Sequence, residues 1–190
     1  MYRFLALAST PLVYGLFRLE TRGIERLPTH GFVLSANHVS NLDPWSLGIP
    51  LFPRRWLRFM AKSELYWWPL SLVLDGAGAF KVRRGRSDTG AIETAVELVR
   101  AGEIVVMFPE GTRQRKGMRK KRSARPHSGA ARIAHLAGVP LVPAAIKGTE
   151  RLAHLGKWKV AYGEPFEPGD DAQAATERLM REIDALHETL

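Results

Sequence analysis

The chain has 190 residues, of which 45% are hydrophobic and 25% charged, a balance typical of one globular domain with a substantial core. It contains no cysteine, which excludes disulfides, thiolate metal sites and a cysteine nucleophile, and which fits a reducing compartment. The formal net charge of +9 is typical of proteins that meet phosphate groups, in nucleic acid, in lipid headgroups or on a phosphorylated substrate.

The first segment of the chain is apolar and rich in aromatic side chains. Its apolar stretch, residues 4–17, is shorter than the roughly 20 residues that cross a bilayer, and Pro11 and Gly15 interrupt it. No small-residue cleavage site of a signal peptide follows it cleanly. We expect residues 1–19 to form a helix that lies in the membrane interface, and residues 20–190 to form the main domain. The alternative is a helix docked on the protein's own core.

Strands and helices are predicted to alternate along the rest of the chain. A polar connector is expected at 20–28. Short apolar runs bounded by turn residues predict strands at 31–36, 57–61, 78–82, 103–108, 141–146 and 157–162. Helical patterns are found at 45–51, from Ser63, at 87–100, at 128–137 and after Asp170 or Asp171, where Leu179, Ile183 and Leu186 would face inward. This alternation predicts an α/β fold, a single layered domain with a central, mostly parallel or mixed sheet flanked by helices.

The turn after the first of these strands contains His38 and Asp43. Pro44 suits the first position of the following helix, so Asp43 is predicted to be its N-cap. On one continuous helix a spacing of five residues would place the two side chains about 140° apart. With His38 in the turn, the Asp43 carboxylate can instead fold back to the imidazole, fix its tautomer and leave the other ring nitrogen as a base. A capped turn without catalytic function is the alternative.

Two further turns carry groups suited to binding anions. Arg83-Arg84 follows the strand at 78–82, and Glu110-Gly111-Thr112-Arg113 follows the strand at 103–108. In open α/β sheets the functional residues gather beyond the carboxyl ends of the strands. Arginine side chains and exposed backbone amides bind phosphate, and a glycine lets the backbone approach a ligand closely. We therefore expect these turns and the His38 turn to meet at one edge of the sheet.

Four blocks in order resemble the glycerophospholipid acyltransferases, whose best-known members acylate lysophosphatidic acid. The blocks are Asn37-His38-x4-Asp43, Gly78-Ala79-Phe80-x3-Arg84, Phe108-Pro109-Glu110-Gly111-Thr112-Arg113 and Val139-Pro140-Leu141-Val142-Pro143. The resemblance covers roughly residues 20–165. It implies a glycerol-3-phosphate acyltransferase-like fold and the transfer of a fatty acyl group from acyl-CoA or acyl-carrier protein to a glycerol hydroxyl.

The resemblance also implies a role for each motif residue. His38 would be the general base that takes the hydroxyl proton, and Asp43 would orient it and balance its charge. Arg84 and the residues Glu110, Gly111, Thr112 and Arg113 would hold the glycerol phosphate, with Lys62 as a further contact. No cofactor or metal is implied. The absence of cysteine and of a Gly-x-Ser-x-Gly elbow fits direct transfer without an acyl-enzyme.

Two features concern substrates and partners. Arg83 stands where relatives commonly have a polar or acidic residue, which adds positive charge at the rim. Residues 113–125 contain eight Lys or Arg. This basic run would attract an anionic membrane surface, an acidic acyl-carrier protein or the phosphates of CoA; the alternative is a solvated, disordered loop. Together with the lysophospholipid acceptor, these features predict a peripheral or monotopic enzyme at the cytoplasmic face of a membrane.

Other functional classes fit the sequence less well. A nucleic-acid binder is compatible with the charge, but the basic run lacks interleaved aromatics and no recognition motif is present. A non-catalytic membrane-associated relative would not need the His38 and Asp43 pair. An acyltransferase for glycerol-3-phosphate or another lipid acceptor remains the alternative within the same family.

Overall fold

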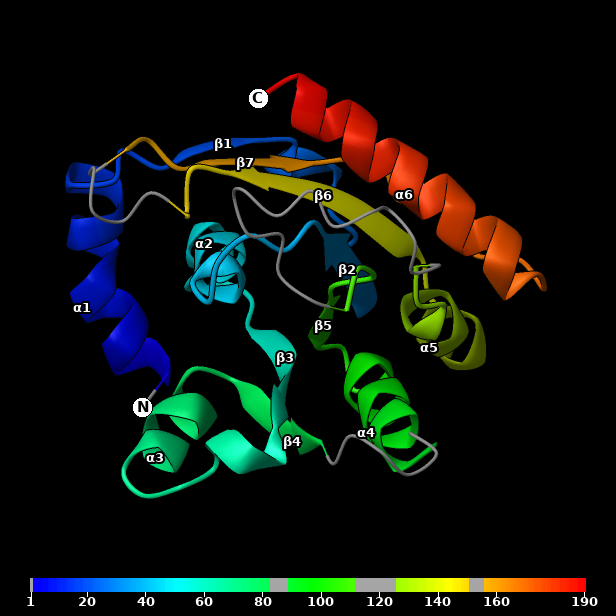
Figure 1. Cartoon of the computed structure of the whole chain (residues 1–190), viewed down its shortest axis with the longest axis horizontal. Helices are drawn as coiled ribbons and strands as arrows, with labels where there is room; N and C mark the ends of the chain where they lie inside the picture. Colours follow the sequence, from blue (N-terminus) through cyan, green and yellow to red (C-terminus); the bar gives the residue numbers. More distant parts are fainter. Residues whose placement is uncertain (1, 83–88, 112–125, 151–155) are drawn as a thin grey trace.

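A computed structural model of the chain describes residues 2–82, 89–111, 126–150 and 156–190 (Figure 1). Within these residues, one seven-stranded sheet forms the centre of the molecule, in the order β1-β7-β6-β2-β5-β3-β4. Its strands are β1 Glu20–Arg22, β2 Phe32–Ala36, β3 Leu57–Lys62, β4 Ala79–Val82, β5 Ile104–Met107, β6 Leu141–Lys147 and β7 Lys159–Tyr162.

The sheet is mixed but mostly parallel, as the sequence predicts. β6, β2, β5, β3 and β4 run parallel, whereas β7 is antiparallel to β6 and β1 is parallel to β7. In the central ladder Leu34 lies opposite Val106 on one side and Val142 on the other. The five parallel strands therefore end at a common edge, and the turns after β2, β3, β4, β5 and β6 all start there.

One strand was not predicted. Residues 20–22 were expected to belong to a polar connector, but they form β1, with Glu20 opposite Lys159 in β7. Lys157 donates a hydrogen bond of 2.8 Å to Glu20. That hydrogen bond, and the positive charge that comes with it, hold the pKa of the Glu20 carboxyl below its ordinary value. The short polar segment has no apolar pattern of its own, so its pairing with β7 is what makes it a strand.

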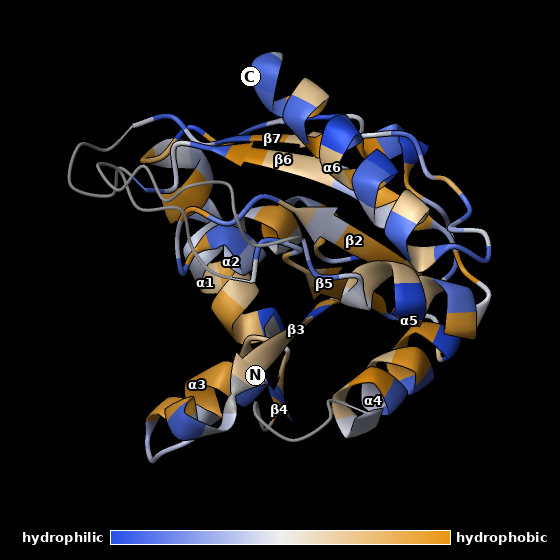
Figure 2. Cartoon of the chain, turned by 45° about the vertical axis from the view of Figure 1, so that its right-hand side comes forward, coloured by the Kyte–Doolittle hydropathy of each residue, from blue (hydrophilic) through white to orange (hydrophobic). Residues whose placement is uncertain are grey.

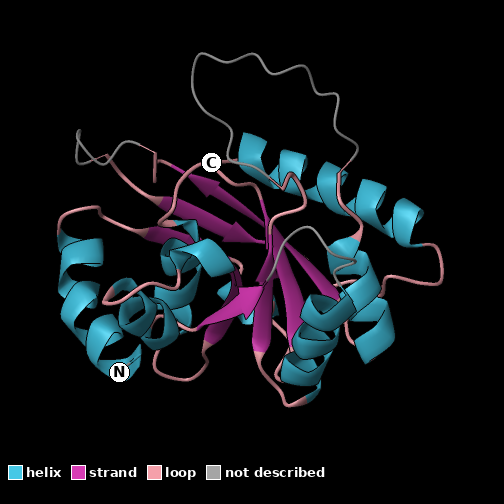
Figure 3. Cartoon of the chain, turned by 60° about the horizontal axis from the view of Figure 1, so that its bottom comes forward, coloured by secondary structure: helices cyan, strands magenta, loops and turns pink. Residues whose placement is uncertain are grey.

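Helices cover both faces of the sheet (Figures 1 and 3). On one face, α1 Tyr2–Gly15 and α2 Asp43–Gly48 cover the side chains of Phe32 and Leu34. On the other, α4 Thr89–Arg100, α5 Gly129–Ala137 and α6 Ala172–Glu188 cover Val33 and Val105. Side chains alternate between the two faces along each strand, so the continuous apolar runs of the sequence supply both halves of the core.

Short helical segments complete the first face. α3 Leu70–Gly76 lies beside α1 and β4, and single 3₁₀ turns occur at Ile24–Arg26, Ile49–Leu51 and Ser63–Leu65. The helix that was expected to begin at Ser63 is therefore only one turn long; Pro69 follows it, and the α-helix begins at Leu70.

The last helix forms as predicted. Asp171 caps α6 by accepting hydrogen bonds from the backbone N–H groups of Gln173, at 2.8 Å, and Ala174, at 3.0 Å. Leu179 and Ile183 are buried against the sheet.

The first helix has two apolar faces. Ala6 and Val13 of α1 are buried in the core, so the helix is docked on the protein. Phe4, Leu7 and Leu12 point to solvent from the same helix. No helix in the described ranges is long and apolar enough to cross a membrane.

Candidate active site

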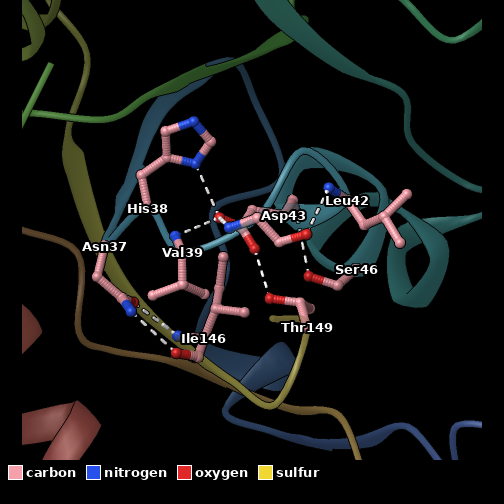
Figure 4. Close-up of polar contacts among 9 residues, drawn as sticks. Asn37, His38, Val39, Leu42, Asp43, Ser46, Ile146 and Thr149 are labelled. Carbon is pink, nitrogen blue, oxygen red and sulfur yellow. Dashed lines mark hydrogen bonds and ion pairs between the residues drawn. The ribbon is translucent and has the colours of Figure 1, made fainter. Parts of the chain in front are cut away.

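The turn that contains His38 is fastened to the neighbouring strand β6 by Asn37. The Asn37 side-chain amide donates to the Ile146 carbonyl at 2.9 Å, and the Ile146 N–H donates to the amide oxygen at 2.8 Å (Figure 4). Both bonds are buried, where a paired amide is strongly preferred. Asn37 therefore extends the β2–β6 pairing by one residue through its side chain and fixes where the turn begins.

His38 and Asp43 meet as predicted. Nδ1 of His38 lies 2.8 Å from Oδ2 of Asp43, and the imidazole is 19% exposed whereas the carboxylate is fully buried. A carboxylate can only accept in this contact, so Nδ1 carries the proton and Nε2 is left with a free lone pair. The pair thus consists of a buried, fixed acceptor and a partly exposed ring that can receive a proton.

The Asp43 carboxylate does not cap its own helix, contrary to the sequence prediction. Asp43 is the first residue of α2, and its carboxylate folds back over the preceding turn. Oδ2 accepts the backbone N–H groups of Val39, at 2.7 Å, and Ser40, at 2.8 Å, in addition to the imidazole. The five-residue spacing therefore works because the chain between the two residues wraps around the carboxylate and turns its N–H groups toward it.

One face of the imidazole is covered by an aromatic ring just after β5. Phe108, the residue after this strand, stacks on His38 with the ring centroids 4.1 Å apart and the planes at 19°. The carboxyl ends of β2 and β5 are adjacent, which brings the two rings together. The imidazole is thus held at Nδ1 by a hydrogen bond and over its face by an aromatic stack.

The candidate phosphate-binding residues start at the same edge. Lys62 is the last residue of β3, and Glu110, half-buried, follows Phe108 on the turn after β5. Gly111 has φ +68°, and a Cβ there would lie 2.7 Å from the imidazole of His127, so the turn requires glycine. The backbone N–H of His127 donates to the Pro109 carbonyl at 2.8 Å, which closes the turn.

The other residues predicted to bind phosphate lie outside the described ranges. They are Arg84, Thr112 and Arg113. Arg83 and the rest of the basic run 113–125, to which other roles were assigned, also lie outside these ranges.

Thr149 contacts Asp43, and the sequence did not predict this contact. It follows β6, is fully buried, and donates its hydroxyl to Oδ1 of Asp43 at 2.6 Å. Asn37 and Phe108 were identified only as members of sequence motifs, and no role was assigned to them. Among the described residues, no group of three or more His, Cys, Asp and Glu side chains is arranged to hold a metal ion.

Comparisons with known proteins identify the family of the chain. The family model for acyltransferases matches residues 18–147. The chain is 34% identical over its whole length to the 1-acyl-sn-glycerol-3-phosphate acyltransferase of Bacillus subtilis, covering 95% of that protein. It is 30% identical over 76% of its length to the chloroplastic enzyme BAT2 of Brassica napus, of which the match spans 41%.

A solved structure has the same fold. The PlsC acyltransferase of Thermotoga maritima superimposes with a TM-score of 0.70 at 24% identity, over 97% of this chain and 78% of that one. The family match over most of the chain, and the full-length relative with it, lead to one conclusion: the chain belongs to the acyltransferase family and is an O-acyltransferase.

Proposed function

We propose that the protein transfers a fatty acyl group from an acyl thioester to the free hydroxyl of lysophosphatidic acid or a related lysoglycerophospholipid. The observation that carries this proposal is the pairing of a partly exposed imidazole with a buried carboxylate at the carboxyl edge of the sheet. The acceptor is inferred from the relatives, because the full-length match is named a 1-acyl-sn-glycerol-3-phosphate acyltransferase.

The reaction needs one base and no covalent enzyme intermediate. Nε2 of His38 takes the proton of the acceptor hydroxyl as its oxygen attacks the thioester carbonyl carbon. The tetrahedral intermediate collapses by breaking the carbon–sulfur bond, and the departing thiolate takes the proton back from the imidazolium. The products are the new ester and a free thiol, so atoms and charge balance without a metal or cofactor.

Asp43 assists by its position and its charge. Its bond to Nδ1 keeps the proton on that nitrogen, so Nε2 faces the substrate as an acceptor. The carboxylate is fully buried, so its negative charge is poorly screened and stabilises the imidazolium that forms during transfer. The hydrogen bonds from Val39 and Ser40 keep it oriented.

The acceptor phosphate is proposed to bind to the turns beside His38. Arg84, Thr112 and Arg113 would supply charged and polar donors, Lys62 would add a contact from the end of β3, and Gly111 would allow the backbone to come close. Glu110 cannot favour a phosphate, so we assign it to the glycerol hydroxyl or to bracing an arginine. The support is that the β3 and β5 ends share the edge where His38 lies.

An interfacial location is proposed from the exposed apolar surface of α1 and α3. Hydrophobic residues are frequent along both helices (Figure 2). Phe4 on α1 is 73% exposed, and Trp67 and Trp68, just before α3, are 59% and 78% exposed. Tryptophan at this density on a surface favours the boundary between membrane and water. Trp45 of α2 donates to Ser9 of α1 at 3.0 Å, so this surface is linked to the helix that begins with Asp43. Substrates with long acyl chains could then enter from the lipid.

The test is acyl transfer by the purified protein. Labelled acyl-CoA and acyl-carrier protein would each be offered with lysophosphatidic acid, glycerol-3-phosphate, lysophosphatidylcholine and monoacylglycerol. We expect phosphatidic acid as the main product, weak use of the acceptor without phosphate, and a loss of at least about 100-fold in His38→Ala. Preference for glycerol-3-phosphate would show that it, and not lysophosphatidic acid, is the acceptor. Full activity of His38→Ala would show that His38 is not the general base.

A further inference from the structure

The two oxygens of the Asp43 carboxylate have different partners. Oδ2 accepts hydrogen bonds from His38, Val39 and Ser40, which all belong to one turn. Oδ1 accepts from Thr149, which is 106 residues away in sequence and follows β6. The carboxylate is therefore held from two sides, by its own turn and by a separate strand of the sheet (Figure 4).

Thr149 uses its hydroxyl differently from three threonines in the helices. Thr10, Thr94 and Thr176 donate to the backbone carbonyl four residues earlier, which is a common local bond within a helix. A threonine hydroxyl has one proton to donate. Thr149 donates that proton to the carboxylate that faces the imidazole, at 2.6 Å, in the range of a strong charge-assisted bond.

The backbone before Thr149 holds this hydroxyl in place. Gly148 has φ +97°, and a Cβ there would lie only 2.2 Å from the Lys157 carbonyl oxygen. The chain leaving β6 therefore passes close to the backbone of Lys157, in a conformation that glycine adopts without strain. Thr149 is fully buried after this turn, so its side chain has one environment in which to sit.

We infer that Thr149 is a positioning residue for acyl transfer, which sets the rotation of the Asp43 carboxylate and so the direction in which Oδ2 meets His38. The torsion between Cβ and the carboxyl group has a broad energy minimum and is weakly defined by itself. Bonds to Oδ2 alone leave the group able to rock about that oxygen; the bond to Oδ1 removes this freedom. The inference rests on the proposed function, in which His38 is the base.

Thr149→Val tests the inference because it removes the hydroxyl and keeps the shape. We expect kcat to fall about 10- to 100-fold, the range for losing a hydrogen bond to a charged group. The KM values for acyl donor and acceptor should stay within about twofold, since Thr149 bonds to Oδ1 of Asp43, whereas His38 bonds to Oδ2. Thr149→Ser, which keeps the hydroxyl, should recover most of the activity. Thr176→Val is the matched control, a buried threonine whose hydroxyl bonds within α6, and it should leave kcat unchanged.

A double-mutant cycle separates positioning from packing. If Thr149 acts through the carboxylate on His38, Thr149→Val should have little further effect on kcat in a His38→Ala background. Equal losses in both backgrounds, an unchanged kcat in Thr149→Val, or failure of Thr149→Ser to recover activity would each overturn the inference. If Thr149→Val does not fold, the kcat ratio of Thr149→Ser to Thr149→Ala replaces it, with a ratio near one as the refuting result. A fully active His38→Ala would instead refute the proposed function.

Discussion

Replacing Asp43 by asparagine should leave the fold intact and remove most of the activity. The amide oxygen can take the place of Oδ2 and accept the N–H groups of His38, Val39 and Ser40, while the amide nitrogen faces the Thr149 oxygen, which can accept. The imidazole then keeps its tautomer and orientation. What is lost is the negative charge beside the imidazolium.

The size of this loss follows from the geometry. Oδ2 lies 2.8 Å from Nδ1 on a buried carboxylate, so the two charge centres would be roughly 4 Å apart. At an effective dielectric constant of about 20, that separation stabilises the imidazolium by about 4 kcal/mol. The expected fall in kcat is therefore about 10³-fold. It would be measured as thiol released from acyl-CoA at saturating lysophosphatidic acid.

Thermal stability distinguishes Asp43→Asn from Asp43→Ala. Asp43→Ala removes the acceptor of Val39, Ser40 and Thr149, at about 1–3 kcal/mol for each buried donor left without a partner, and should lower Tm by roughly 10 °C or more. Asp43→Asn should keep Tm near the wild-type value. An Asp43→Asn enzyme that folds normally and retains kcat within about tenfold of wild type would refute an electrostatic role for the carboxylate.

Three further predictions concern residues outside the His38–Asp43 pair. Phe108→Leu removes the ring stacked on the imidazole and should lower kcat about 2- to 10-fold, the equivalent of an aromatic contact; a steady-state assay with an unchanged kcat would exclude such a role for the stack. Gly111→Ala and Gly138→Ala both place alanine at φ +68°, but only at Gly111 would the Cβ meet a side chain, so only that variant should raise the acceptor KM. The double variant Trp67→Ser with Trp68→Ser should reduce salt-resistant binding to phospholipid vesicles in a sedimentation assay, and unaltered binding would remove the interfacial role of these side chains.

The parallel core of the sheet was predictable because its signals are local. Short, continuous apolar runs such as residues 104–107 and 141–146 favour strands covered on both faces, and the breaks between them are marked by glycine and proline. Once these strands are parallel, the turns that contain His38 and Glu110 must meet at one edge. The placement of the site followed from topology and not from any single residue.

The features that the sequence did not predict depend on contacts that form only in the folded protein. β1 consists of Glu20, Thr21 and Arg22, which carry no apolar pattern, and only pairing with β7 makes them a strand. The N-cap rule applied to Asp43 failed because the preceding turn offered the carboxylate two N–H groups and an imidazole. Thr149 could not be found locally, since its partner depends on β6 lying next to β2.

The bonds between Asn37 and Ile146 also have a consequence for how the protein acquires activity during synthesis. These residues are 109 positions apart, and both bonds between them are buried. The sequence from Asn37 to Asp43 is translated early, but its turn has no complete set of partners until the chain has been extended through β6. Contacts of such long range form slowly, because a large loop must close before they contribute. Catalytic competence should therefore appear together with the closing of the sheet, and a nascent chain that ends before β6 would carry the whole motif without a working base.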